Sequence, residues 1–149
     1  ARVNVATVLQ QSLKELGIEV EIGVMEFGTY LDKTAAGEHD MFILGWSNAT
    51  GDADYGLYAL FHSSQHGEPG NRSFYTNAKV DELLDTGRRE ADQAVREAIY
   101  KEAMQLLTDD APMAFVLHPA VLTGVANNVT GFYVTSDNMY HLKDVKITE

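Results

Sequence analysis

Apolar runs and stretches of alternating polarity divide the chain into helical and extended segments. Residues 3–16 carry apolar side chains at helical spacing and end before Gly17, which predicts an amphipathic helix with a glycine C-cap. Residues 18–24 alternate apolar with polar positions, and residues 41–44 are all apolar and too few for a helix. The first pattern is typical of a strand with one buried face, and the second of a strand covered on both faces.

Further helices are predicted between and after these strands. Candidate N-caps are Thr29, Asn77 and Asp92, for helices ending near residues 36, 87 and 108, and a further apolar helical face spans residues 56–61. The apolar face of the longest helix comprises Val95, Ala98, Ile99, Ala103, Leu106 and Leu107. Later strands are predicted at 113–117, 121–125, 132–134 and 142–147. The alternation predicts an α/β fold with a mainly parallel sheet flanked by helices and a short mixed β tail.

The length, net charge and cysteine content of the chain limit the functions that it can have. A chain of 149 residues is long enough for one domain with a real core. Its 22 acidic and 11 basic residues give a net charge of −11, which disfavours nucleic-acid binding because phosphate neutralisation needs a basic surface. Cysteine is absent, which excludes disulfides and thiolate chemistry. Residue 1 leads almost directly into a helix, so we expect the chain to be cut from a longer protein.

The loop after the apolar run 41–44 carries the most distinctive chemistry. It holds the only tryptophan, Trp46, then Asn48 and the carboxylates Asp52 and Asp54. In open α/β sheets the carboxyl edge of the strands is where ligands bind. Trp46 is therefore either a core residue at a strand end or an apolar wall of a binding crevice. Large rings beside carboxylates and amides suit peptide-like ligands.

Two other site types remain as alternatives. His62 and His66, with Asp52 and Asp54 nearby in sequence, could form a metal site. A small hydrolase could use Asp52 or Asp54 with a histidine, although no Gly-x-Ser-x-Gly elbow is present. Glycine spacing matches neither dinucleotide nor P-loop fingerprints. A purely structural interaction domain is a further alternative, and it predicts a covered Trp46.

Residues 44–61, Leu-Gly-Trp-Ser-Asn-Ala-Thr-Gly-Asp-Ala-Asp-Tyr-Gly-Leu-Tyr-Ala-Leu-Phe, resemble the signature region of the oligopeptide- and dipeptide-binding proteins of ABC importers, the extracellular solute-binding proteins of family 5. Similar stretches elsewhere are Leu-Lys-Glu-Leu-Gly-Ile-Glu-Val at 13–20, Asn-Arg-Ser-Phe-Tyr-Thr-Asn at 71–77 and Val-Asp-Glu-Leu-Leu at 80–84. The resemblance covers nearly the whole chain. It is specific to the family and says little about the ligand.

The resemblance implies a non-enzymatic peptide carrier without cofactor or metal. Family members are two-lobed clamps in the periplasm or on the cell surface as lipoproteins, and they deliver peptides to an ABC permease in the membrane. This chain resembles the carboxyl-terminal lobe of such a protein. Residues 1–119 correspond to a periplasmic-binding-protein-like ligand-binding lobe, and residues 120–149 to a segment returning to the hinge and the first lobe. The implied partners are a peptide, the missing amino-terminal lobe and the permease.

The same resemblance implies a set of ligand-binding residues: Trp46, Ser47, Asn48, Ala49, Asp52, Asp54 and Tyr55. In well-understood relatives an aspartate three residues after the tryptophan receives the ammonium terminus of the peptide, and this chain has Ala49 there. That contact comes from Asp52, from elsewhere or from no residue. The Thr-Gly-Asp-Ala-Asp version resembles binders of longer peptides held through backbone hydrogen bonds. Since closure needs the other lobe, we expect the isolated chain to bind peptide poorly.

Overall fold

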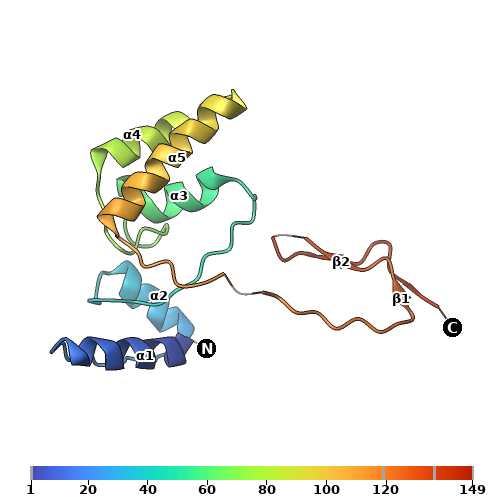
Figure 1. The fold of residues 1–149 in the computed structure, drawn as a ribbon, viewed down its shortest axis with the longest axis horizontal. Helices are drawn as coiled ribbons and strands as arrows, with labels where there is room; N and C mark the ends of the chain where they lie inside the picture. The colour runs from blue at the N-terminus through green and yellow to red at the C-terminus, as the bar shows by residue number, and fades with distance from the viewer. Residues whose placement is uncertain (1, 119, 136, 149) are drawn as a thin grey trace. The chain divides into compact units, whose positions relative to one another are not determined.

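The computed structural model, drawn as a ribbon in Figure 1, describes residues 2–118, 120–135 and 137–148. These residues fall into two compact units. The first unit comprises Ala1–Trp46 and Ala59–Asp81, and the second comprises Ser47–Tyr58 and Glu82–Glu149. Residues 1, 119 and 149, at which the predicted lobe and returning segment begin or end, lie outside the described residues. The division at 119 and 120 therefore stays a prediction.

Helix α1 (Arg2–Glu15) confirms the first predicted helix and its glycine cap. Gly17 has a φ of 79°, and the Ile18 N–H donates to the Leu13 carbonyl at 3.0 Å. This is a Schellman ending, which favours glycine because a Cβ is strained at positive φ. No residue of α1 is buried, and Val8 and Leu16 are 62% and 75% exposed. The predicted apolar face therefore exists, but the described part of the chain covers it only partly, at Val5 and Leu13.

Helix α2 (Phe27–Ala35) begins earlier than predicted because Glu26, and not Thr29, caps it. The Glu26 carboxylate accepts a hydrogen bond from the Thr29 N–H at 3.0 Å. Backbone hydrogen bonds from Gly28 and then Thr29 hold the pKa of Glu26 below its usual value. Thr29 is thus already inside the first turn. The preference for short N-cap side chains is a tendency that a longer carboxylate can override.

Helix α3 (Ala53–Phe61) also begins before its predicted start at residue 56, and the short 3₁₀ turn η1 (Ser63–Gln65) follows it. The Asp52 Oδ1 atom accepts a hydrogen bond from the Asp54 N–H at 2.8 Å, which satisfies an amide of the first turn. Phe61, at the end of α3, is 1% exposed and meets the Tyr75 ring edge-on at 6.4 Å. Phe61 and Val80 are the large buried apolar side chains of the first unit.

Helices α4 (Ala78–Gly87) and α5 (Gln93–Asp110) begin where their caps predict. The Asn77 Oδ1 atom accepts from the Lys79 N–H at 2.9 Å. Asp92 Oδ1 accepts from Ala94 and Val95 N–H groups at 2.9 and 3.0 Å. α5 spans 18 residues, but no helix in the described ranges is both long and apolar enough to cross a membrane.

The buried face of α5 is only partly the predicted one. Ala103 and Leu107 are buried as predicted, whereas Val95 is 48% exposed. Ala98 is also exposed, and Tyr100, which the apolar pattern omitted, is 4% exposed. A tyrosine can be buried when its hydroxyl finds polar partners, and the Tyr100 hydroxyl has them in Arg96 and Asp54. The remaining buried apolar residues of the second unit are Leu83 and Leu84.

The strands of the described residues are short and antiparallel. β1 (Val129–Thr130) pairs with β4 (Lys146–Ile147), with Val129 opposite Ile147. β2 (Tyr133–Val134) pairs with β3 (Tyr140–His141), with Tyr133 opposite His141. The predicted strands 132–134 and 142–147 are therefore confirmed only in part, at 133–134 and 146–147, whereas β1 and β3 lie outside the predicted ranges.

The four strands predicted at 18–24, 41–44, 113–117 and 121–125 are wrong for this chain: these segments belong to no strand. Within the described residues, the only parallel pairing is an isolated bridge between His66 and Asn71. Many apolar side chains of these segments stay exposed, Val24 at 71% and Phe115 at 64% among them. An apolar pattern predicts burial, but a strand also needs a neighbouring backbone to pair with. The parallel sheet is thus not formed by this chain's described residues alone.

Candidate functional site

Trp46 ends the segment, without helix or strand, that follows α2 in the first unit. The Tyr30 hydroxyl donates to the Ile43 carbonyl at 3.0 Å, which ties this segment to α2. A Cβ added at Gly45 would lie 3.3 Å from the Arg2 guanidinium, so the Arg2 side chain reaches the backbone before Trp46. Trp46 itself is 38% exposed. The indole therefore presents apolar surface to solvent and is not sealed in a core.

The loop after Trp46 belongs to the second unit and is ordered by its own polar groups. The Asn48 side-chain amide donates to the Asp52 carbonyl at 2.6 Å, and the Thr50 hydroxyl donates to Asn48 Oδ1 at 3.2 Å. The Gly51 N–H donates to the Asn48 carbonyl at 3.2 Å. Asn48 thus closes the loop on itself. Of the other predicted site residues here, Ser47, Ala49 and Tyr55 are exposed.

Asp52 forms a two-pronged ion pair with Arg96 of α5. The Arg96 Nη1 and Nη2 atoms donate to Asp52 Oδ2 and Oδ1 at 2.7 and 2.6 Å. Arg96 Nε donates to the Gly87 carbonyl at 3.0 Å, which fixes the guanidinium plane at the end of α4. The hydrogen bond from Arg96, followed by one from the Asp54 backbone, lowers the pKa of Asp52 below its usual range. Both oxygens of this predicted ligand-binding carboxylate are therefore engaged within the chain.

Asp54 is held in the same way by Arg88. Arg88 Nε lies 3.3 Å from Asp54 Oδ1, and Nη2 donates to Oδ2 at 3.4 Å. The guanidinium carbon of Arg88 lies 3.7 Å above the Tyr58 ring, a cation–π contact. Tyr100 completes the group, because its hydroxyl donates to Asp54 Oδ1 at 3.4 Å. We refer to Asp52, Asp54, Arg88, Arg96 and Tyr100 as the acid–arginine network.

The electrostatics of the network keep its donors protonated. Burial, and then the nearby Asp54 carboxylate, raises the pKa of Tyr100, so its hydroxyl remains a hydrogen-bond donor. The Asp52 carboxylate raises the pKa of Arg96 further above the range in which it could lose a proton. The sequence pattern predicted the two acids as site residues but gave no sign of Arg88 and Arg96. They lie 34 and 44 residues away along the chain, and no local spacing connects them to the loop.

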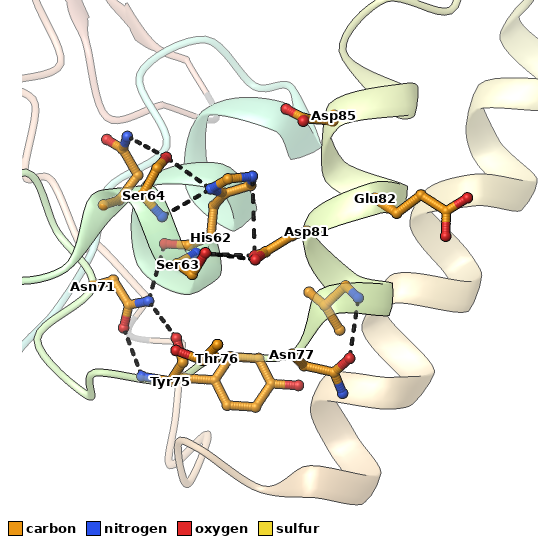
Figure 2. A network of polar contacts seen from close by, with 12 residues as sticks. His62, Ser63, Ser64, Asn71, Tyr75, Thr76, Asn77, Asp81, Glu82 and Asp85 are labelled. Carbon is orange, nitrogen blue, oxygen red and sulfur yellow. Dashed lines mark hydrogen bonds and ion pairs between the residues drawn. The ribbon is translucent and has the colours of Figure 1, made fainter.

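The histidine that follows α3 builds a local turn of the first unit (Figure 2). His62 Nδ1 accepts the Ser64 N–H at 3.0 Å and lies 2.7 Å from the Ser64 hydroxyl. Asp81 accepts from Ser63 twice, from its N–H at 2.9 Å and its hydroxyl at 2.5 Å. His62 Nε2 is 4.0 Å from Asp81 Oδ1, longer than a hydrogen bond. The ring therefore caps η1, and the acid anchors the turn.

Asn71 closes the loop that follows this turn (Figure 2). It is 0% exposed, and its amide donates to the His62 carbonyl at 3.1 Å and the Tyr75 carbonyl at 3.0 Å. Its side-chain oxygen accepts the Tyr75 N–H at 3.2 Å. His66 Nε2 lies 2.9 Å from the Tyr75 carbonyl. Throughout the ranges 2–118, 120–135 and 137–148, no three His, Cys, Asp or Glu side chains gather as metal ligands would.

The contacts of Asp52, His62 and Asp81 argue against the hydrolase alternative. A general base works best with a pKa near the operating pH, whereas the pKa of Asp52 is lowered by Arg96. In a serine triad the histidine lies between the nucleophile and the acid. Here Ser63 donates directly to Asp81, and His62 Nδ1 is taken by the Ser64 backbone. These contacts order loops, and they do not arrange a nucleophile for attack.

Comparison with known proteins gives a consistent family assignment. Residues 1–68 match the model of the family described as bacterial extracellular solute-binding proteins, family 5 Middle. The glutathione-binding protein GsiB of Pectobacterium atrosepticum is 30% identical over 146 residues, covering 94% of this chain and 28% of the relative. The dipeptide-binding protein of Escherichia coli is 27% identical, covering 97% of this chain and 27% of the relative. The chain thus spans about a quarter of the length of these relatives.

Solved structures agree with this assignment. The Helicobacter pylori periplasmic binding protein DppA, in complex with the peptide STSA, superposes with a TM-score of 0.67 and 38% identity, over 73% of this chain and 22% of that one. The oligopeptide-binding protein AppA of Bacillus subtilis, in complex with a nonapeptide, gives a TM-score of 0.66 and 30% identity, over 74% and 22% of the two chains. The predicted fold class, an α/β lobe of the periplasmic-binding type, is thereby confirmed. The chain belongs to the bacterial extracellular solute-binding proteins of family 5.

Proposed function

We propose that this chain supplies one wall of the peptide-binding crevice in the substrate-binding component of an ABC importer. The observation that carries the proposal is the exposed indole of Trp46, directly before a self-ordered polar loop, in a chain similar to two proteins solved with bound peptides. An exposed ring suits a ligand with an apolar side chain, and an exposed loop next to it in the chain suits a ligand with a repeating main chain.

The proposed ligand-binding residues are those of the segment from Trp46 to Tyr55: Trp46, Ser47, Asn48, Ala49, Asp52, Asp54 and Tyr55. Trp46 and Tyr55 would cover peptide side chains with their rings. Ser47 and Ala49 are exposed, and their backbone groups would pair with the main chain of an extended peptide. Asn48, Asp52 and Asp54 would shape the loop, because their side chains are bonded within it or to the arginines. Water-bridged pockets would then accept varied side chains.

The remaining parts of the proposal concern the whole protein. The protein that carries this chain is a non-enzymatic carrier. It binds oligopeptides outside the cytoplasm, in the periplasm or at the cell surface as a lipoprotein. Its further partners are a second lobe of the same protein and the membrane permease subunits, and binding needs no cofactor. The extracellular description of the family and the dipeptide- and glutathione-binding relatives support these points.

Calorimetric titration of the protein that carries this chain, with peptides of four and nine residues as in the two peptide complexes, tests the proposal. Trp46→Ala is expected to weaken binding about thirtyfold, the usual effect of losing an aromatic side chain that the bound partner buries. Phe27→Ala is the matched control, since Phe27 is a 57% exposed ring of the same unit. Equal affinity for the wild type and Trp46→Ala would show that the indole is not part of the site.

A further inference from the structure

The Arg96 guanidinium bonds to the loop that follows Trp46 and also to residues of α4 and α5. Each of its three nitrogens donates within the second unit: Nε to Gly87, Nη1 to Asp52, and Nη2 to Asp52 and Tyr100. The Arg96 side chain is 20% exposed and that of Asp52 is 41% exposed. A planar fork bonded to both carboxylate oxygens is the strongest geometry for such a pair. Asp52 is therefore open to solvent but already matched with a cation.

Both carboxylates between residues 47 and 55 are paired with an arginine. Residues 47–55 contain two acids, Asp52 and Asp54, and Arg88 holds the second. A ligand ammonium group approaching either acid would meet a guanidinium beside it. The attraction of the carboxylate would be largely offset by repulsion from the arginine, because the pair is close to neutral at the distance of a ligand.

We infer that Arg96 determines specificity in the proposed peptide site: by neutralising Asp52, it makes the loop indifferent to the charge of a peptide's amino terminus. The inference rests on the proposed function and names a substrate class for it. The site would accept peptides with a free amine and peptides with a blocked amine equally well. Binding would then depend on the peptide main chain and on side chains that meet the rings of Trp46 and Tyr55.

The experiment compares one peptide in two forms, with a free and with an acetylated amino terminus, by calorimetry on the protein that carries this chain. In the wild type the two dissociation constants should agree within about threefold, less than the effect of one charged hydrogen bond. Arg96→Met removes the guanidinium but keeps the length of the chain. Because Asp52 is then an uncompensated carboxylate, the free-amine form should bind about tenfold more tightly than the acetylated form.

Three further variants test whether the new preference comes from the pairing of Arg96 with Asp52. Lys101→Met removes an exposed cation from the same helix and should leave the ratio of the two constants at the wild-type value. Asp52→Asn combined with Arg96→Met should abolish the new preference, because no carboxylate remains at residue 52. A purely structural role of Arg96 would weaken both peptide forms equally and leave their ratio unchanged. Asp52→Asn alone leaves the Arg96 guanidinium without its carboxylate, so it should shift the ratio toward the acetylated form. An unchanged ratio in this variant would contradict the inference, which keeps the test decisive if Arg96→Met does not fold.

The possible failures are distinguishable. A wild-type preference of about tenfold for the free amine that Asp52→Asn removes would overturn the inference and keep the proposed function. An Arg96→Met protein that folds and shows no new preference would overturn it as well. If neither form of any peptide binds the wild type, the proposed function itself is wrong, and the inference with it.

Discussion

Asn71→Ala is expected to destabilise the first unit more than any surface substitution. The side chain is 0% exposed and makes three hydrogen bonds to backbone groups, with His62 and Tyr75 as partners. The two carbonyls keep other neighbours, the Gln65 N–H for His62 and the His66 ring for Tyr75, so each loss costs about 0.5–1 kcal/mol. The Tyr75 N–H loses the partner that the Asn71 side chain provides, which costs about 1–3 kcal/mol. The expected loss is about 3 kcal/mol of unfolding free energy.

Urea unfolding followed by the fluorescence of Trp46 measures this loss, because the single tryptophan belongs to the same unit as Asn71. The midpoint should fall while the slope stays constant, as for a change of stability alone. Asn127→Ala is the matched control, since Asn127 is exposed in a turn, and should shift the free energy by less than about 0.5 kcal/mol. If Asn71→Ala costs less than about 1 kcal/mol, the loop is not held by this side chain and the reasoning fails.

Two further predictions concern pH and helix ends. The pKa of Asp52 is lowered in the folded chain, so its stabilisation is complete above its usual value of 3.8 and is lost as the pH falls through the folded value. Asp52→Asn should therefore lower the urea midpoint at neutral pH and flatten its decline in acid; parallel curves for the two proteins would contradict this. Ala111, the C-cap of α5, has a φ of 49°, so Ala111→Gly should raise stability by about 0.5–1 kcal/mol. Thermal unfolding measures the change against Ala98→Gly, at an exposed position inside α5, which should lose about 1 kcal/mol.

Interactions between residues close together in the sequence were enough to predict most of the helices. The caps at Asn77 and Asp92 and the glycine ending at Gly17 are interactions between residues a few positions apart, and the structure confirms all three. Helix hydrogen bonds are also local, so a short stretch of sequence contains most of the information that a helix needs. The starts of α2 and α3 were the exceptions. The longer side chain of Glu26 performs a capping role usually taken by shorter ones, and α3 begins at Ala53, before its predicted start at residue 56.

The strands and the state of the loop acids depend on residues that are distant in sequence. Residues 41–44 have the pattern of a buried strand, but pairing depends on a second backbone that the pattern does not specify. The loop acids were visible in the sequence, whereas their arginine partners came from α4 and α5 through the packing of the second unit. The sequence by itself determined which segments form helices, where α4 and α5 begin, and which loop carries the tryptophan and two acids. The tertiary structure alone decided that the two acids are neutralised, because ion pairs form between side chains that only folding brings within a few ångströms.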